Sequence, residues 1–166
     1  WVLGETLITG IGQGYIQVTP LQLCLMTAQL ANGGYKIYPK IVLNNDDKDL
    51  REDKFEPLYK DSKNIKIVQE AIFSSTNEVR GTSYRSRIED SKYQFAGKTG
   101  TAQVKRISEL DRELDLKTFE IPYEQRDHAL YIAYGPYKDP RYALSSIIEH
   151  GGSGSSTAAP IAKKLF

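Results

Sequence analysis

The segment from Gly97 to Thr101, with the sequence Gly-Lys-Thr-Gly-Thr, gathers the residue types best suited to chemistry in this chain. A lysine ammonium group supplies positive charge, and a threonine hydroxyl can donate or accept a hydrogen bond. The glycines let a ligand approach the backbone closely. Such a segment suits an anionic ligand, either a phosphate or a carboxylate. A bare Lys-Thr-Gly also occurs by chance on surface strands, so its surroundings decide between these interpretations.

The first interpretation is a phosphate-binding P-loop, Gly-x-x-x-x-Gly-Lys-[Ser/Thr], whose backbone amides hold nucleotide phosphates. This pattern requires a glycine at position 92, where the chain has Lys92. It also requires a helix directly after Thr99, whereas small and β-compatible residues continue through positions 101–104. A nucleotide-binding protein that uses Gly97-Lys98-Thr99 therefore stays only as a minor alternative.

The second interpretation is the Lys-Thr-Gly box that accompanies a nucleophilic serine in penicillin-recognising enzymes. The string Phe95–Gln103 resembles the third-motif strand of the class B penicillin-binding proteins. Other landmarks of that family have counterparts in the same order: Gly10–Tyr15 with Thr19–Gln22, Asp127–Leu130 with Ala133–Pro136, and Glu149–Gly152 with Ala158–Ala162. Because these landmarks cover most of the chain, the sequence is identified as a member of class B, most similar to its elongation-type branch.

The resemblance implies a peptidoglycan D,D-transpeptidase that cross-links stem peptides through an acyl-serine intermediate and is acylated by β-lactams. It implies that Lys98 holds charge near the nucleophile, that Thr99 binds the substrate or β-lactam carboxylate, and that the Thr101 amide serves the oxyanion hole. Gly97 and Gly100 are expected to permit close approach. No metal or organic cofactor is implied. The parent protein is expected at the periplasmic face of the bacterial inner membrane, beside cell-elongation membrane proteins.

Two departures from the family pattern limit what this chain does alone. No serine is followed by a lysine three residues later, so the Ser-x-x-Lys nucleophile box is absent. The letters Ser75-Thr76-Asn77 match the middle Ser-x-Asn motif, but they end a predicted helix shortly before Lys98, whereas the family's copy precedes Gly10–Tyr15. The chain also begins at Trp1, as a processed product or excised piece would. Residues 1–166 are therefore expected to be the C-terminal part of a transpeptidase domain, inactive alone.

An incomplete domain is expected to expose apolar surface where its missing N-terminal half packs, and this face favours dimerisation or strand exchange. A second function remains open for the complete protein. It could be a non-catalytic sensor module that binds β-lactams or peptides without turnover. An intact Ser-x-x-Lys box that is acylated but does not cross-link would favour this alternative.

Composition excludes several other functions. The 22 Lys and Arg residues balance 21 Asp and Glu residues, so the clustered basic charge typical of nucleic-acid binding is lacking. No apolar run approaches the ~20 residues of a membrane-spanning helix. A single cysteine, Cys24, excludes an internal disulfide and a cysteine-rich metal site. His128 and His150 have no acidic cluster with metal-ligand spacing, so we interpret both as structural or solvent-facing.

Periodicity and turn residues predict the elements that position this segment. A helix capped by Thr19 is expected to run from Pro20 to Gly33-Gly34 with a buried face that includes Leu21. A second helix is expected to bury Ile65, Val68, Ile72 and Val79 and to stop at Gly81. Strands are predicted at 95–104, 128–137 and 142–149, followed by a helix capped by Ser155 or Ser156.

The remaining segments are predicted to be irregular. Gly4–Gly14 is expected to be a loop, 35–42 a short extended segment, and 44–63 and 105–127 polar excursions. The second excursion contains a helix-like Ser108–Leu114 and could cover the substrate groove. Consecutive hairpin strands flanked by helices predict an α+β fold with an antiparallel sheet. By resemblance, this is the C-terminal portion of the serine β-lactamase and penicillin-binding-protein transpeptidase fold.

Overall fold

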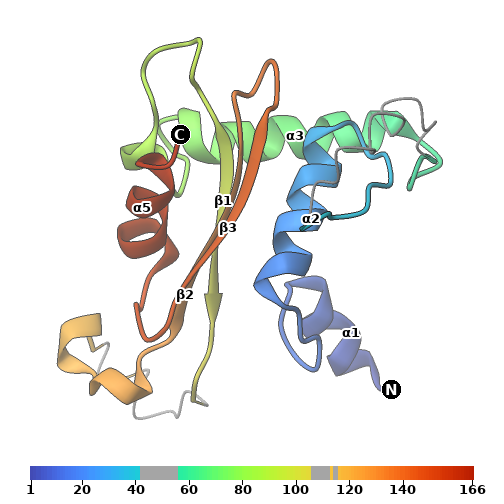
Figure 1. The fold of residues 1–166 in the computed structure, drawn as a ribbon. Coiled ribbons are helices and arrows are strands. Elements are labelled where there is room, and N and C mark those ends of the chain that lie inside the picture. The colour runs from blue at the N-terminus through green and yellow to red at the C-terminus, as the bar shows by residue number, and fades with distance from the viewer. Residues whose placement is uncertain (42–55, 106–112, 114–115) are drawn as a thin grey trace.

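The computed structural model describes residues 1–41, 56–105, 113 and 116–166. Its centre is an antiparallel sheet in the order β1-β2-β3, formed by Ala96–Ala102, His128–Gly135 and Tyr142–Ile148. Helices lie on both sides of this sheet (Figure 1). The predicted α+β fold with an antiparallel sheet is therefore confirmed, with strand ends that differ by at most two residues from the expectation.

Helices α2 (Pro20–Ala31) and α3 (Ser62–Asn77) support the sheet, since α2 packs across β3 and β2 while α3 lies along β1. The predicted cap of α2 is present. Thr19 Oγ1 accepts a bond from the Gln22 amide at 3.2 Å, and the Gln22 side chain accepts one from the Thr19 amide at 2.8 Å. The Gln69 side chain of α3 joins the two helices by donating to the Leu30 carbonyl at 2.6 Å.

The C-terminal segment covers the opposite face of the sheet. A π-helical turn, Gly154–Ala158, leads into α5 (Ala159–Lys163). Because small side chains line the contact, the helix approaches the sheet closely, and two large rings fill the remaining space. The buried cluster consists of Phe95, Ala129, Tyr131, Ala133, Ala158, Ala159 and Ala162. This cluster is the core that fixes β1 and β2 from one side.

The predicted cap at Ser155 or Ser156 is wrong, because no side chain caps this helical segment. The segment instead begins at Gly154, two to three residues before the start that these caps would give. A β-carbon on Gly154 would lie 2.7 Å from the Gly100 carbonyl oxygen, so the chain can turn this close to the sheet only without a side chain.

The predicted loop at Gly4–Gly14 is also wrong in its first part, since α1 spans Leu3–Gly10. A β-carbon on Gly4 would meet nothing within 4 Å, so this glycine lowers helix propensity without marking a special backbone position. Only Gly12 and Gly14, with φ of 77° and 91°, adopt the left-handed conformation that favours glycine. No residue of α1 is buried.

The predicted buried faces of the helices are too wide. Leu21, Val68 and Val79 are 57%, 40% and 78% exposed, whereas Ile65 is buried. Each helix meets the rest of the described structure along a narrow stripe, so apolar periodicity overestimates the covered face. Helix α3 also ends at Asn77, before the predicted stop at Gly81.

The two predicted polar excursions lie partly outside the described residues, as does the helix-like Ser108–Leu114 except for position 113. Ahead of α3, Asp61 accepts a bond from the Lys63 amide at 2.8 Å and caps the helix. The expected extended segment makes one isolated bridge, between Tyr35 and Pro57. Within the described ranges, no helix combines the length and apolar character needed to cross a membrane.

Candidate functional site

Strand β1 carries the Lys-Thr-Gly segment at the outer position of the sheet. Its inner edge pairs with β2, so that Lys98 lies opposite Ile132 and Thr101 opposite Ala129. Among the described residues, no strand pairs with its outer edge. Lys98 and Thr101 are exposed, and Thr99 and Gly100 are partly exposed. The structure therefore presents these residues on an accessible strand edge.

The outer edge offers backbone groups as well as side chains. The Gly97 carbonyl accepts a bond from Thr76 Oγ1 at 3.0 Å, and the Thr99 carbonyl accepts one from Lys98 Nζ at 2.9 Å. Both carbonyls thus point away from β2. Since the peptide groups of alternate residues in an antiparallel strand point to the same side, the Thr101 N–H shares this direction. A backbone donor is therefore available on the edge that carries the lysine.

Lys98 and Thr99 bring a cation and a hydroxyl together. Lys98 Nζ lies 3.3 Å from Thr99 Oγ1, within hydrogen-bond distance. An ammonium group and a hydroxyl at this separation can both donate to one carboxylate, and a charge-assisted bond is about twice as strong as a neutral one. The edge can therefore bind an anionic group of a ligand at Lys98 and Thr99. The Thr101 amide, two residues after Thr99, can donate to another oxygen of the same ligand.

The structure fixes β1 from behind through buried hydroxyl groups. Tyr131 Oη donates to Ser83 Oγ at 2.9 Å and lies 3.1 Å from Thr76 Oγ1. Burial raises the pKa of Tyr131, while its hydrogen bonds with Ser83 and Thr76 oppose part of this rise. The phenol is therefore held neutral and serves as a structural anchor.

The rejected Ser75-Thr76-Asn77 copy lies where the sequence predicts, at the end of α3. Thr76 is fully buried beneath β1. The Asn77 side chain donates to the Phe95 carbonyl at 2.9 Å and to the Phe73 carbonyl at 3.0 Å. These bonds attach the helix end to the start of β1, so this segment supports the strand structurally.

The two histidines meet where the turn after β3 contacts the start of β2. The His150 amide donates to His128 Nδ1 at 2.9 Å, and His150 has a φ of 54°. His150 Nδ1 lies 3.1 Å from the Arg126 carbonyl. Both side chains thus have structural partners. Within the parts of the chain that the structure describes, no cluster of His, Cys, Asp and Glu could hold a metal ion.

The described part of the second excursion lies beside this turn. It contains two short 3-10 helices, η3 (Thr118–Glu120) and η4 (Tyr123–Gln125), and Tyr123 Oη donates to the Glu149 carbonyl at 3.5 Å. Figure 1 shows these helices past the end of β1, on the side of α5. Over this described part, the excursion packs on the β3–α5 connection, and the rest of it lies outside the described residues.

Comparison with known proteins decides the family. A sequence profile described as the penicillin binding protein transpeptidase domain matches residues 1–166. The chain belongs to this family. It is 35% identical to the peptidoglycan D,D-transpeptidase MrdA of Haemophilus influenzae over 171 aligned residues, which cover 100% of the chain and 26% of MrdA. It is 28% identical to the Escherichia coli K12 protein of the same name, over 93% of the chain and 24% of that protein.

Solved structures of this family agree with the fold. Helicobacter pylori PBP2, in a complex with MreC, has a TM-score of 0.77 and 32% identity, covering 99% of this chain and 27% of PBP2. Pseudomonas aeruginosa PBP2, in a complex with WCK 5153, has a TM-score of 0.72 and 34% identity over 99% of this chain and 32% of that one. The chain thus spans about a quarter to a third of these relatives, and the recognition of a class B transpeptidase domain is confirmed.

Sequence reasoning missed three residues around the site: Thr76, Thr82 and Tyr131. Thr82 Oγ1 lies 3.2 Å from Thr99 Oγ1, although 17 residues separate the two along the chain. In the sequence, Thr76 belongs to a motif copy that we reject, and Tyr131 is one position of the predicted strand 128–137 with no local signal of its own. The local signal for Thr82 is its place directly after Gly81, the expected helix stop.

Proposed function

We propose that this chain is the C-terminal part of the transpeptidase domain of a peptidoglycan D,D-transpeptidase. In this proposal a serine outside the chain attacks a stem peptide or a β-lactam and forms an acyl-serine intermediate. The observation that supports it most directly is the meeting of Lys98 and Thr99 on the outer edge of β1, 3.3 Å apart at Nζ and Oγ1. Family membership supplies the reaction class.

Each residue of the edge then has a role. Lys98 places positive charge near the nucleophile, and Thr99 donates a hydrogen bond to the carboxylate of the substrate or β-lactam. The Thr101 amide donates to the developing oxyanion, where one such donor contributes about 10²–10³ in rate. Gly100 is proposed to permit close approach of the substrate, and Gly97 leaves room for Tyr131 behind the strand.

The proposed transpeptidase function also implies partners. The missing N-terminal half of the domain would supply the nucleophile, and the parent protein would be anchored at the periplasmic face of the inner membrane. Cell-elongation membrane proteins are proposed partners, supported by the complex of Helicobacter pylori PBP2 with MreC. No cofactor enters the proposed chemistry.

Fluorescent penicillin labelling tests this function. The longer parent protein, its Lys98→Gln variant and the isolated chain are compared on a denaturing gel. We expect label on the parent, about 10²-fold slower labelling of K98Q, and none on the isolated chain. Because Lys98 is exposed, the substitution should leave folding intact. Label on the isolated chain would reveal a reactive serine within it, and an unlabelled parent would contradict the proposal.

An assay of peptide cross-linking distinguishes the transpeptidase from the non-catalytic sensor. A parent protein that is labelled by penicillin and also cross-links peptidoglycan stem peptides is a transpeptidase. Labelling without cross-linking would favour the sensor. The nucleotide-binding alternative is not supported, because Gly97-Lys98-Thr99 lie inside β1 rather than in a loop before a helix.

A further inference from the structure

Thr82 lies next to the proposed carboxylate-binding hydroxyl. Thr82 Oγ1 is 3.2 Å from Thr99 Oγ1 and also 3.2 Å from Ser75 Oγ. Three hydroxyl groups thus form a row from the end of α3 to the outer edge of β1. Lys98 Nζ lies 3.3 Å from the same Thr99 oxygen.

The backbone around Thr82 is locked to α3. A β-carbon on Gly81 would lie 2.6 Å from the Ser74 carbonyl oxygen, so the chain passes the helix end at a distance that only glycine permits. Ser83, which directly follows Thr82, is buried. Its amide and its hydroxyl both donate to the Ser75 carbonyl at 3.1 Å. The backbone of Thr82 is therefore held between Gly81 and Ser83, which both contact the end of α3.

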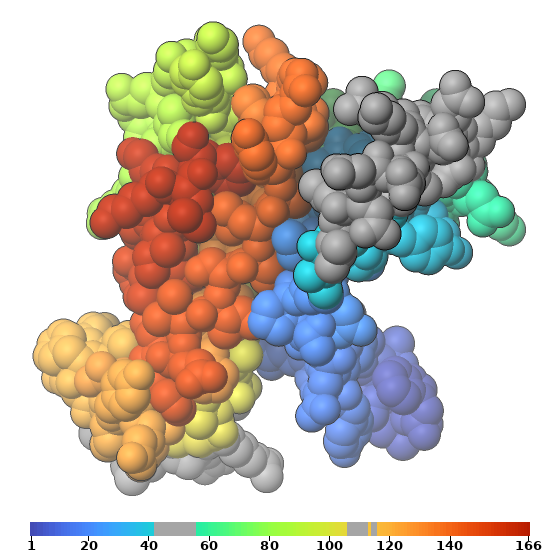
Figure 2. Space-filling view, viewed as in Figure 1, coloured from blue at the N-terminus to red at the C-terminus, as the bar shows by residue number. Residues whose placement is uncertain are grey.

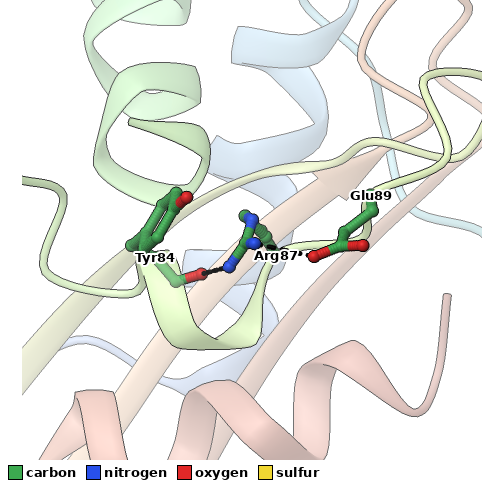
Figure 3. A network of polar contacts seen from close by, with 3 residues as sticks. All are labelled: Tyr84, Arg87 and Glu89. Carbon is green, nitrogen blue, oxygen red and sulfur yellow. Dashed lines mark hydrogen bonds and ion pairs between the residues drawn. The ribbon is translucent and has the colours of Figure 1, made fainter. Parts of the chain in front are cut away.

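The segment after Thr82 is braced as well. It enters the 3-10 helix η2 (Tyr84–Ser86), and Arg87 folds back over it (Figure 3). The Arg87 guanidinium lies 4.0 Å from the centre of the Tyr84 ring, donates to the Tyr84 carbonyl at 3.3 Å, and pairs with Glu89 at 2.7 Å. A side chain on such a constrained turn can set the direction of its neighbour.

Hydroxyl chemistry gives this contact a function. A hydroxyl has one proton to donate and two lone pairs that accept. If the Thr99 proton is to point at a ligand carboxylate, its lone pairs must accept from the protein. Lys98 satisfies one lone pair, and Thr82 can satisfy the other, with Thr82 accepting in turn from Ser75. We propose that Thr82 is a positioning residue that directs the Thr99 hydroxyl proton toward the carboxylate of the substrate or β-lactam.

This inference rests on the proposed function, and its test separates the two. The experiment uses three forms of the parent protein: the wild type, Thr82→Val and Thr82→Ser. Each is treated with benzylpenicillin and with its methyl ester, which lacks the free carboxylate. Thr82 is exposed, so both variants should fold, and serine keeps the hydroxyl. For each protein with each compound, the second-order acylation rate is resolved into a binding constant and an acylation rate constant.

We expect T82V to lower the second-order rate for benzylpenicillin about three- to tenfold, the effect of one hydrogen bond. The rate for the methyl ester should stay unchanged, and T82S should recover most of the loss. Equal losses for penicillin and ester, or no rescue by serine, would overturn the positioning role and show a general structural effect. A T82V rate equal to wild type would also overturn it.

A wild-type protein that forms no adduct would overturn the proposed function itself, and with it the role of Thr82 in that function. Crystal structures of the wild type and of T82V then show directly whether Thr82 holds Thr99. We expect the Thr99 hydroxyl to rotate away from its wild-type position in the variant. An unchanged Thr99 would overturn the positioning.

Discussion

The ring of Tyr131 lies directly against Gly97, and a β-carbon on Gly97 would come within 2.6 Å of the ring carbon Cε1. Through this gap the Tyr131 hydroxyl reaches Ser83 and Thr76, from elements that precede β1 in the chain. The glycine that the sequence suggests as a place of substrate approach thus accommodates a buried side chain. The absence of a side chain at Gly97 therefore lets the buried Tyr131 support β1 from behind.

Replacing Gly97 by alanine is expected to destabilise the protein by about 1–3 kcal/mol, because the added methyl group overpacks the buried Tyr131 ring. Urea unfolding measures this change. Gly4→Ala provides the matched control, since a β-carbon there meets nothing within 4 Å and sits in helix α1. G4A should be neutral or slightly stabilising. A G97A variant as stable as G4A would contradict the packing.

Thr76→Val is expected to lower the free energy of unfolding by about 1–3 kcal/mol, because it leaves buried hydrogen-bonding groups without a partner. Thr76 is fully buried and donates to the Gly97 carbonyl at 3.0 Å. Thr76→Ser keeps the hydroxyl and should cost less. Urea denaturation of both variants measures the difference, and equal losses would show that the methyl group rather than the hydroxyl matters.

Alkaline pH is expected to destabilise the protein through its buried tyrosines. Burial raises the pKa of Tyr134 above the ordinary value of 10.0, and its hydroxyl has no partner among the described residues. Below pH 10 this phenol is protonated in both states. Above pH 10 the unfolded state loses the proton first, so stability falls by up to about 1.4 kcal/mol per pH unit for this group.

The variant Tyr134→Phe tests this assignment. It removes an unpartnered buried hydroxyl, so it should be neutral or stabilising at pH 8 and should reduce the loss of stability between pH 10 and 11. Urea unfolding at a series of pH values gives both quantities. An alkaline loss identical to that of the wild type would show that other groups cause it, such as Tyr131 and Tyr137, whose pKa values burial also raises.

The isolated chain is expected to self-associate through its N-terminal residues. Trp1, Leu7 and Ile11 are 83%, 67% and 74% exposed, and Figure 2 shows this segment (dark blue) at the lower right margin of the molecule. Sedimentation at increasing concentration should show dimers, and the Leu7→Glu variant should weaken them. Ile67→Glu, on an exposed part of α3, is the control. Equal effects of the two variants would place the association elsewhere.

The sequence by itself determined the family, the three antiparallel strands and the cap of α2. These features depend on short-range patterns. Runs of strand-forming residues bounded by turn residues predict the strands, Thr19 followed by Pro20 predicts the helix cap, and the residues around Lys98 indicate the family. It was less informative about burial, as Leu21 and Val79 show, because periodicity reveals an apolar stripe but not the width of the surface that covers it.

Only the tertiary structure decided what holds the site in place. Thr76, Thr82 and Tyr131 lie 21, 17 and up to 55 residues from the partners they meet around β1. Serine and threonine hydroxyls carry no periodic signal, since they are equally at home on an exposed turn or in a buried network. Their partners are set by how α3 is attached to the edge of the sheet, and that arrangement is a property of the folded chain.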